Sequence, residues 1–436
     1  MKNKTFLALL GLVQAANVWA MDKGMSPGMV PVGPFDFMPL LSISESHSDN
    51  IFYNNLNKKA SLITQIGGGG ELALRRKLDR YALHYAFLSS QYHSSPADNY
   101  VDHNLGATAH FDFTQRNRLD FSSGLIYSHL MRGTILFQDD NSDTQAIATQ
   151  PGIRQPSITQ LNEPDQYHQY NANINYRYGR TDAKGNLGLE LGWIQLTYDN
   201  HLDRNAQSDN TQFVITPGFY FRLRPKTYLT TQIQNTFVNY ANPNNNYDLR
   251  RYLMGVTWDL SAKTKGSLRA GYLQQEFSSA GQQSMSGLTW DGQVQWLPLT
   301  YSILSFNLSN NIQPGIGSGS SAKLKVYNAN WQHNWPNRVT TNLSGAYQEV
   351  QYLNAAQGIN SGITFKFDVK YQMRSWLTLA SITCDRIIKM IIMVIIFQMT
   401  VRKIFLCSML MPCPKRGTTK PSTPIRIFEC SKYSVL

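Results

Sequence analysis

The residues that could do chemistry in this sequence are dispersed along it. Histidine is the usual choice for acid–base catalysis and metal ligation, but the histidines here lack the spacing of metal ligands. No G-x-S-x-G motif, which would mark a serine nucleophile, occurs in the sequence. The nine histidines fall in predicted loops or at scattered strand positions: His47, His84, His93, His103, His110, His129, His168, His201 and His333.

Residues 67–70 are consecutive glycines, and a glycine-rich loop can bind phosphate where it connects a strand to a helix. Here the glycines lie inside a predicted strand pair, so we interpret them as a bend or bulge. The sequence therefore predicts no catalytic residue, no metal site and no cofactor, and the protein is not expected to be an enzyme. A hydrolase that assembles serine and histidine across strands stays open, because such a pair leaves no local motif.

The strongest pattern in the chain is alternate-residue hydrophobicity, which is repeatedly interrupted by turns. A period of two places apolar side chains on one face of a strand and polar side chains on the other. The repeats run about ten residues, as a tilted strand needs to cross the hydrocarbon layer, whereas soluble strands are usually about five or six residues long. Clear examples are residues 105–113, 170–178, 288–296 and 363–371.

Aromatic residues near the predicted strand ends, such as Trp258, Trp296, Trp331 and Trp335, match the girdles of a membrane barrel. Short turns alternate with longer polar loops and delimit about sixteen strands and the start of another. Because bacterial barrels have even strand counts, we predict an all-β fold, a transmembrane antiparallel up-and-down β-barrel of about 16–18 strands. Such a barrel is wide enough for an aqueous channel.

Two predicted strands are irregular. The alternation that begins at Leu187 changes phase at Leu196, which we interpret as a bulge near Ile194. Pro217 lies in the middle of another strand, where it removes a hydrogen-bond donor from the ladder.

The longest predicted loop, residues 132–166, is placed outside the cell, and the short turn at residues 224–226 in the periplasm. The loop contains Asp139, Asp140 and Asp143. It could fold inward as a constriction or lid, because long loops in compact structures are often functional. Its composition also fits a disordered surface loop, so both interpretations stay open.

The polar faces of the strands should line the lumen. Their charges are mixed in sign, so no ring of a single sign selects anions or cations. An amide- and hydroxyl-rich wall suits a neutral or weakly charged polyhydroxylated solute, and equally suits water. Candidate lumen-lining residues are Asn171, Asn173, Asn175, Arg177, Arg222, Asp259, Asp291, Gln293, Lys366, Asp368 and Lys370.

The N-terminus resembles a secretory signal. Lys2 and Lys4 precede an apolar run at residues 6–13, and Ala20 is a suitable last residue before cleavage. We therefore assign residues 1–20 to a signal peptide, 21–36 to a periplasmic segment and 37–380 to the barrel. A signal peptide followed by a barrel places the protein in the outer membrane of a Gram-negative bacterium.

Residues 381–436 differ from the rest of the chain. They contain all four cysteines, and alternation gives way to an isoleucine- and methionine-rich run at 387–397. That run is too short for a spanning helix and includes Lys389. One interpretation is a genuine tail. We favour a frameshift in the gene, because another frame can encode a polar loop and a closing strand; an aberrant or disordered segment would then contribute no barrel strand.

The formal net charge of +12 does not indicate a nucleic-acid partner. Two of these charges come from Lys2 and Lys4 and seven from residues 381–436, which leaves the barrel weakly basic.

Residues 39–52 (PLLSISESHSDNIF) resemble the opening strand of a family of outer-membrane β-barrel porins found with exopolysaccharide and capsule synthesis genes. Further similarity lies in residues 247–258, 265–272 and 374–379. The resemblance implies a channel for export or assembly of exopolysaccharide or capsular polysaccharide. It implies no catalytic residues, and the terminal strand of the family is absent from its expected place here.

The leading prediction is therefore a passive outer-membrane channel for polysaccharide. The first alternative is a non-transporting barrel that anchors or displays polysaccharide, and the second is an outer-membrane hydrolase. The expected partners are outer-membrane lipid and lipopolysaccharide, a polysaccharide, and the barrel-assembly machinery.

Overall fold

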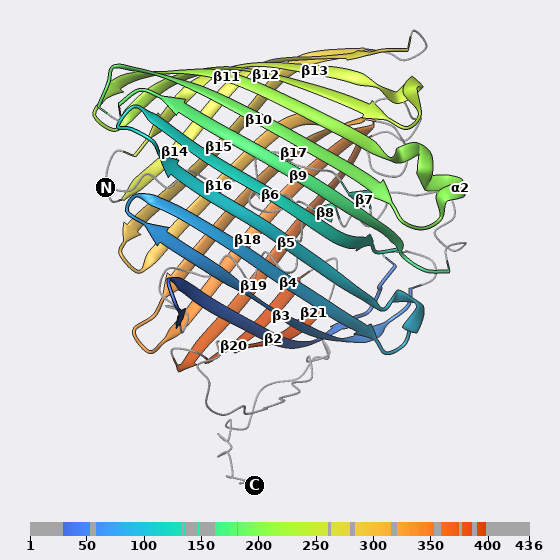
Figure 1. Cartoon of the computed structure of the whole chain (residues 1–436). Helices are drawn as coiled ribbons and strands as arrows, with labels where there is room; N and C mark the ends of the chain where they lie inside the picture. Colours follow the sequence, from blue (N-terminus) through green and yellow to red (C-terminus); the bar gives the residue numbers. More distant parts are fainter. Residues whose placement is uncertain are drawn as a thin grey trace, which may run out of the picture. The chain divides into compact units, whose positions relative to one another are not determined.

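Antiparallel β-strands make up nearly all of the structure (Figure 1). This computed structural model describes residues 29–52, 58–132, 135–136, 147–148, 162–180, 182–259, 263–279, 284–314, 321–352, 359–374, 377–385 and 390–397. They all belong to one unit, Met1–Val401. The expected signal peptide at residues 1–20, the loop residues Asp139, Asp140 and Asp143, and residues 398–436 lie outside the described residues.

The main sheet has 19 strands, of which β1 is a short addition to β2 and the other eighteen form the barrel. Each of these pairs with the next in chain order, β6 pairing with β9 across the long loop. The strands are β1 (Val30–Val32), β2 (Phe35–Ser48), β3 (Ser61–Arg76), β4 (Asp79–Tyr92), β5 (Tyr100–Asp112), β6 (Asn117–Leu130), β9 (Asp165–Tyr178), β10 (Gly185–Tyr198), β11 (Asn210–Arg224), β12 (Thr227–Tyr240), β13 (Tyr247–Trp258), β14 (Thr264–Phe277), β15 (Met285–Leu299), β16 (Ser302–Pro314), β17 (Ser321–Asn334), β18 (Val339–Tyr352), β19 (Ile359–Arg374), β20 (Leu377–Asp385) and β21 (Met390–Phe397). The predicted all-β, up-and-down architecture is confirmed.

Outside the main sheet, β7 (Ile135–Leu136) and β8 (Ile147–Ala148) pair with each other in the loop between β6 and β9. Short helical turns are η1 (Pro96–Asp98), α2 (Leu202–Asn205), η3 (Ala206–Ser208) and η4 (Pro243–Asn245). No helix among the described residues is both long enough and apolar enough to cross a membrane.

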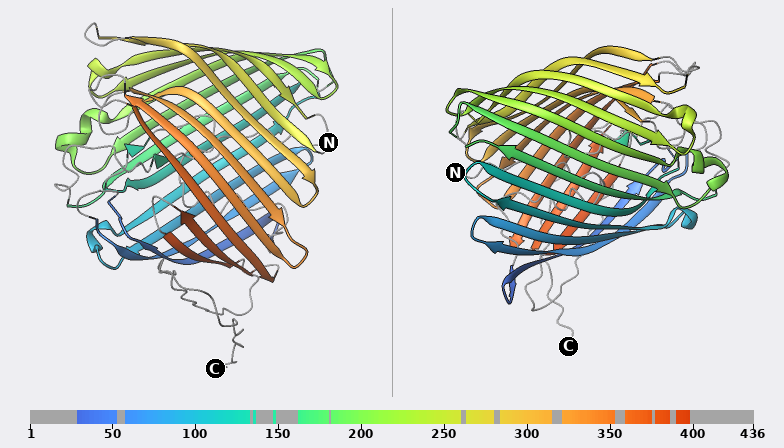
Figure 2. Two further views of the ribbon diagram at one scale, coloured as in Figure 1. Left: turned by 180° about the vertical axis from the view of Figure 1, so that it is seen from behind. Right: turned by 45° about the horizontal axis from the view of Figure 1, so that its top comes forward.

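The two faces of the strands differ as the alternation predicts. On β19, Phe365 and Phe367 are 49% and 45% exposed and alternate with Lys366 and Asp368. Large exposed apolar side chains would be unfavourable in water, but lipid solvates them and leaves the polar set to line the interior. Figure 2 shows the strands of the barrel, all steeply tilted, from behind and obliquely from above.

The C-terminal end of the barrel differs from the prediction. The sequence pattern ends the barrel at residue 380 and predicts no strand beyond it, but β20 continues to Asp385 and β21 follows. β21 pairs with β20 over eight residues and with β2 over seven, so the succession of ladders returns to β2. Two unpaired edges are costly in lipid, and a run rich in isoleucine favours an extended strand. The frameshift itself stays a prediction.

Three further predictions concern the pairing of the strands. No bulge occurs near Ile194, because β10 pairs with β9 and β11 in continuous register; Ile194, Leu196 and Tyr198 point inward instead. The glycines at residues 67–70 form no bulge either, since β3 pairs continuously with β2 and β4. A Cβ on Gly69 would lie 2.1 Å from the Tyr85 carbonyl oxygen, so close approach of the backbone explains a glycine there. Pro217 does interrupt the β11–β12 ladder, as predicted.

The two ends of the barrel carry different connections. The end with α2, on the right in Figure 1, has the longer ones, and the other end has short turns such as that between β11 and β12. This asymmetry is typical of barrels whose long loops face outside the cell.

We therefore expect a cysteine at position 203 to be reached from outside the cell and one at position 182 to be protected. Asp203→Cys and Asp182→Cys would be made in a chain whose four cysteines are replaced by serine, and intact cells would be treated with an impermeant maleimide. Both positions are exposed in the structure, so permeabilised cells, in which both should label, provide the control. Labelling of 182 alone in intact cells would reverse the assigned orientation.

Candidate functional site

Most of the predicted lumen residues lie on the polar face of their strands. Asn171 and Asp291 are nearly fully buried. Asp259 differs, since it lies beyond β13 in an exposed turn, where its N–H donates to the Lys226 carbonyl at 2.8 Å. The residues on the polar faces of β9, β11, β15 and β19 are Asn171, Asn173, Asn175, Arg177, Arg222, Asp291, Gln293, Lys366, Asp368 and Lys370.

A continuous chain of polar contacts crosses the inner wall from β9 to β15. The Arg177 guanidinium lies 4.2 Å from the centre of the Tyr220 ring, and 3.7 Å from the Glu190 carboxylate. Gln232 donates to the Tyr220 hydroxyl at 2.9 Å and accepts a hydrogen bond from Arg269. These contacts hold Arg177 and Arg269 against the wall. Arg177 faces an aromatic ring and a carboxylate, and Arg269 faces an amide.

Asp291 completes this chain by binding two arginines. Its carboxylate accepts a hydrogen bond from Arg269 at 2.6 Å and another from Arg251 at 3.2 Å. Arg251 also donates to Gln234 and Thr289. Because Arg251 is only 1% exposed, its charge depends on these partners. We call Arg177, Glu190, Tyr220, Gln232, Arg251, Arg269 and Asp291 the arginine belt.

A second part of the inner wall, on β17 and β18, is lined by amides. Asn328 and Asn330 share the inner face of β17, and Asn342 lies on β18. Their side-chain oxygens are buried and accept no hydrogen bond from any described group. A buried acceptor without a partner requires an explanation. Because the three residues are only half-buried, rotation of each amide would present its oxygen to water or to a solute hydroxyl. None of these three residues was among the predicted lumen residues, although amides were expected on the wall.

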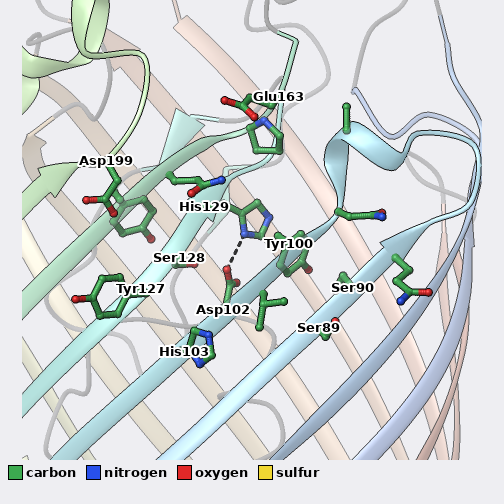
Figure 3. Close-up of a pocket in the computed structure, with 17 residues that line it drawn as sticks. Ser89, Ser90, Tyr100, Asp102, His103, Tyr127, Ser128, His129, Glu163 and Asp199 are labelled. Atoms are coloured by element: carbon green, nitrogen blue, oxygen red, sulfur yellow. Dashed lines mark hydrogen bonds and ion pairs between the residues drawn. The ribbon is translucent and has the colours of Figure 1, made fainter.

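Histidines and carboxylates pair across the outer ends of β5, β6, β9 and β10. Nδ1 of His129 lies 2.9 Å from Asp102 (Figure 3), Nδ1 of His168 lies 2.6 Å from Asp199, and Nδ1 of His201 lies 2.8 Å from Asp165. The two members of each pair lie 27 to 36 residues apart in the sequence. The pairs therefore form no local sequence motif. No group of three or more histidine, cysteine or acidic residues in the described part could hold a metal ion.

Two carboxyl groups outside the strands have shifted pKa values. In the turn between β9 and β10, Arg180 donates to Asp182 at 2.9 and 2.8 Å and lowers the pKa of that carboxyl. Before β11, burial raises the pKa of Asp209, although its carboxylate accepts a hydrogen bond from the Tyr198 N–H. The turn therefore keeps its negative charge, and Asp209 at the outer rim is protonated more readily.

Eighteen antiparallel strands with an apolar outer face and a polar inner face define a porin-like barrel of the Gram-negative outer membrane. The chain belongs to the family described as "Putative beta-barrel porin 2", whose sequence profile matches residues 27–384.

Several solved outer-membrane proteins are similar to this chain. OccAB3 of Acinetobacter baumannii is 11% identical, with 84% of this chain and 99% of that one covered and a TM-score of 0.43. OccK2 (OpdF) of Pseudomonas aeruginosa, solved in complex with glucuronate, is 8% identical, with 83% and 97% covered and a TM-score of 0.44. The FrpB iron transporter of Neisseria meningitidis (F5-1 variant) is 11% identical with a TM-score of 0.42; the match covers 80% of this chain and 61% of FrpB. No curated protein matches the sequence.

Proposed function

We propose that the barrel is a passive channel for neutral or weakly charged polyhydroxylated solutes, and that its cargo is an exopolysaccharide or capsular polysaccharide on its way out of the cell. The observation that carries this proposal is the inner wall. Asn328, Asn330 and Asn342 present buried acceptors without protein partners among the described residues, while Arg251 and Arg269 are both bound to Asp291. Hydroxyl donors can bind such acceptors, and the paired arginines exert a weaker field than free ones.

The family resemblance supports the choice of polysaccharide. A barrel contains no energy source, so transport would depend on diffusion or on force from periplasmic machinery. The predicted partners follow from this role: outer-membrane lipid and lipopolysaccharide around the barrel, the polysaccharide within it, and the barrel-assembly machinery that inserts it.

The described part of the long loop, β7 and β8, favours a constriction. Its hairpin of β7 and β8 lies within the outline of the barrel in each of the three views, near the end where β6 stops (Figures 1 and 2). At the root of the loop, Arg132 donates to Asp98 at 2.6 Å and lies 4.4 Å from the centre of the Phe52 ring. The loop therefore leaves β6 in a fixed position.

A non-transporting surface barrel is the second candidate, favoured by apolar side chains that face inward at the outer end. Leu130, Tyr167, Leu196 and Tyr198 form one buried cluster there. Such clusters narrow the mouth and would suit a barrel that displays a polysaccharide without passing it. A hydrolase has less support. The Asp102–His129 pair forms no complete catalytic triad within the described residues, since Nε2 of His129 has no hydrogen-bond partner there that could be a nucleophile.

Planar-bilayer recordings separate the first two candidates. The purified chain should open steps of ion conductance with little preference between potassium and chloride, because the wall carries no ring of one sign among the described residues. Liposomes that contain the protein should also release entrapped neutral oligosaccharides. Stable insertion without conductance would reject the channel and favour the surface barrel.

Variants that place charges at Asn328, Asn330 and Asn342 provide a control for these recordings. Replacing Asn328, Asn330 and Asn342 together by aspartate should make the channel cation-selective, and replacing them by lysine should make it anion-selective. Unchanged selectivity in both variants would show that these side chains do not line the conducting path.

A further inference from the structure

The barrel wall splits at the outer end of β5 and β6. The ladder between β4 and β5 extends to Ser90↔Tyr100 and that between β6 and β9 to Leu130↔Asp165. The ladder between β5 and β6 ends earlier, at His103↔Tyr127. Residues 100–102 and 128–130 therefore separate although each segment keeps its other neighbour. At about 3.3 Å per residue the split is roughly 10 Å long, and we call it the wall notch.

A cavity of about 550 Å³ occupies the wall notch (Figure 3). Its lining includes Ser90 and Asp102, which are 1% and 5% exposed, and also Val101 and Tyr127, which are 53% and 43% exposed. Successive residues of one strand point to opposite faces of a sheet. Residues whose side chains belong to opposite faces of the wall therefore line the same cavity.

The side chain of His129 bridges the wall notch. Its Nδ1 lies 2.9 Å from Asp102 Oδ1, and its ring stacks on Tyr100 with 3.5 Å between ring centres. The side chains of His129 and Asp102 are each 7% exposed. An ionised carboxylate only accepts hydrogen bonds, so Nδ1 carries the hydrogen, and in the neutral ring Nε2 is an acceptor. This Nε2 is buried without a partner among the described residues.

The rest of the lining indicates which group could donate to Nε2. Hydroxyls of Ser89, Ser90 and Ser128 and amides of Gln91 and Gln166 line the cavity, together with the aromatic rings already named. Of the residues that the structure describes, no lysine or arginine lines the cavity, which disfavours phosphate and other anions. The carboxylates of Asp102, Glu163 and Asp199 also line the cavity. Rings, hydroxyls, amides and carboxylates around an unused acceptor fit a ligand that is rich in hydroxyl donors and carries no negative charge.

We propose that the wall notch binds a neutral sugar residue, one hydroxyl of which donates to Nε2 of His129. The sugar belongs either to a soluble oligosaccharide or to the glycan of lipopolysaccharide in the surrounding leaflet. The site requires no ion flow through the barrel, so it can be tested separately from the channel proposed above.

The test is calorimetric titration of the full chain, folded in detergent, with maltohexaose, cellohexaose and isomaltohexaose, and with hexagalacturonate as an anionic control. At least one neutral hexasaccharide should bind. His129→Phe keeps a ring against Tyr100 and removes Nε2, so affinity should fall about tenfold, as loss of one hydrogen bond predicts. His110→Phe is the matched control, because His110 pairs with Asp120 in the same way and neither residue lines the cavity; it should bind as the natural chain does.

Val101→Trp keeps the proposal testable if His129→Phe does not fold. Val101 is exposed and lines the cavity, so tryptophan should fill the notch while both residues of the Asp102–His129 pair are retained, and binding should be lost. Nanodiscs made with and without lipopolysaccharide distinguish the two sources: hexasaccharide titration of the natural chain that is blocked only where lipopolysaccharide is present identifies the leaflet glycan, whereas equal titration in both identifies a soluble saccharide. The proposal is overturned if neither the hexasaccharides nor lipopolysaccharide occupies the site, or if both variants bind like the natural chain.

Discussion

A chain that ends at residue 389 is expected not to fold into a barrel, whereas one that ends at residue 400 should fold like the full chain. The shorter chain lacks β21, which pairs with β20 over eight residues and with β2 over seven. Its loss leaves two strand edges with unpaired backbone groups, each of which costs several kcal/mol in lipid. A few such groups exceed the roughly 5–15 kcal/mol by which proteins are usually stable.

Heat-modifiable mobility on cold SDS gels measures this difference, since a folded barrel migrates faster before boiling than after it. The chain ending at 400 is the matched control, because it removes the C-terminal residues and none of the described strands. If the chain ending at 389 shows the same mobility shift and protease resistance, the barrel closes without β21 and the pairing with β2 is dispensable.

The strand ladder was predictable because its signal is local. Alternation along residues 363–371 assigns both faces of β19 from that segment alone, and the eighteen strands of the barrel fall within the predicted range of about 16–18. The end of the ladder could not be predicted in this way. Residues 390–397 are apolar at every position, so they carry no period, and a closing strand is selected by the unpaired edges of β2 and β20 rather than by its own pattern.

The origin of residues 381–436 remains a separate prediction. A frameshift and a genuine tail both accommodate a β21 that closes the barrel, because a run of isoleucine and methionine can pair in either case. The base sequence around codon 380 decides between them: an alternative frame that encodes a polar loop followed by an alternating aromatic strand is the expected result.

The prediction of a bulge near Ile194 is wrong because it assumes that every inward side chain along the strand is polar. Leu196 and Tyr198 lie at the outer end of β10, where they pack in a cluster with Leu130 and Tyr167. The change of phase in the sequence therefore marks a change of environment along the strand and not a slip of register.

The candidate site was predicted only in part. Asp291 was assigned to the lumen, but its two arginine partners lie 40 and 22 residues away, and only the tertiary structure brings them together. Arg251 and Arg269 fall within the segments that resemble the porin family, residues 247–258 and 265–272, which was the one available sign of their role. The His129–Asp102 pair left no such sign.

Asp291→Asn is expected to cost about 3–5 kcal/mol of unfolding free energy, because it leaves the buried charge of Arg251 without a counter-charge. Arg269 is partly exposed and can turn toward water, but the side chain of Arg251 is 2% exposed and cannot. Denaturant unfolding in detergent, followed by tryptophan fluorescence, gives the free energy. Asp182→Asn is the control: it breaks an exposed pair with Arg180 and should not shift the midpoint.

The same unfolding measurement on a double variant separates the buried charge from general damage to the wall. Adding Arg251→Met to Asp291→Asn removes the charge that lost its partner and fills the same space with an apolar side chain, so part of the lost stability should return. Arg251→Met alone should also be destabilising, since it leaves Asp291, which is 3% exposed, with Arg269 only. Equal unfolding free energies for Asp291→Asn and Asp182→Asn would contradict the arginine belt as a stabilising feature, and the inner wall would then owe its structure to the backbone ladders alone.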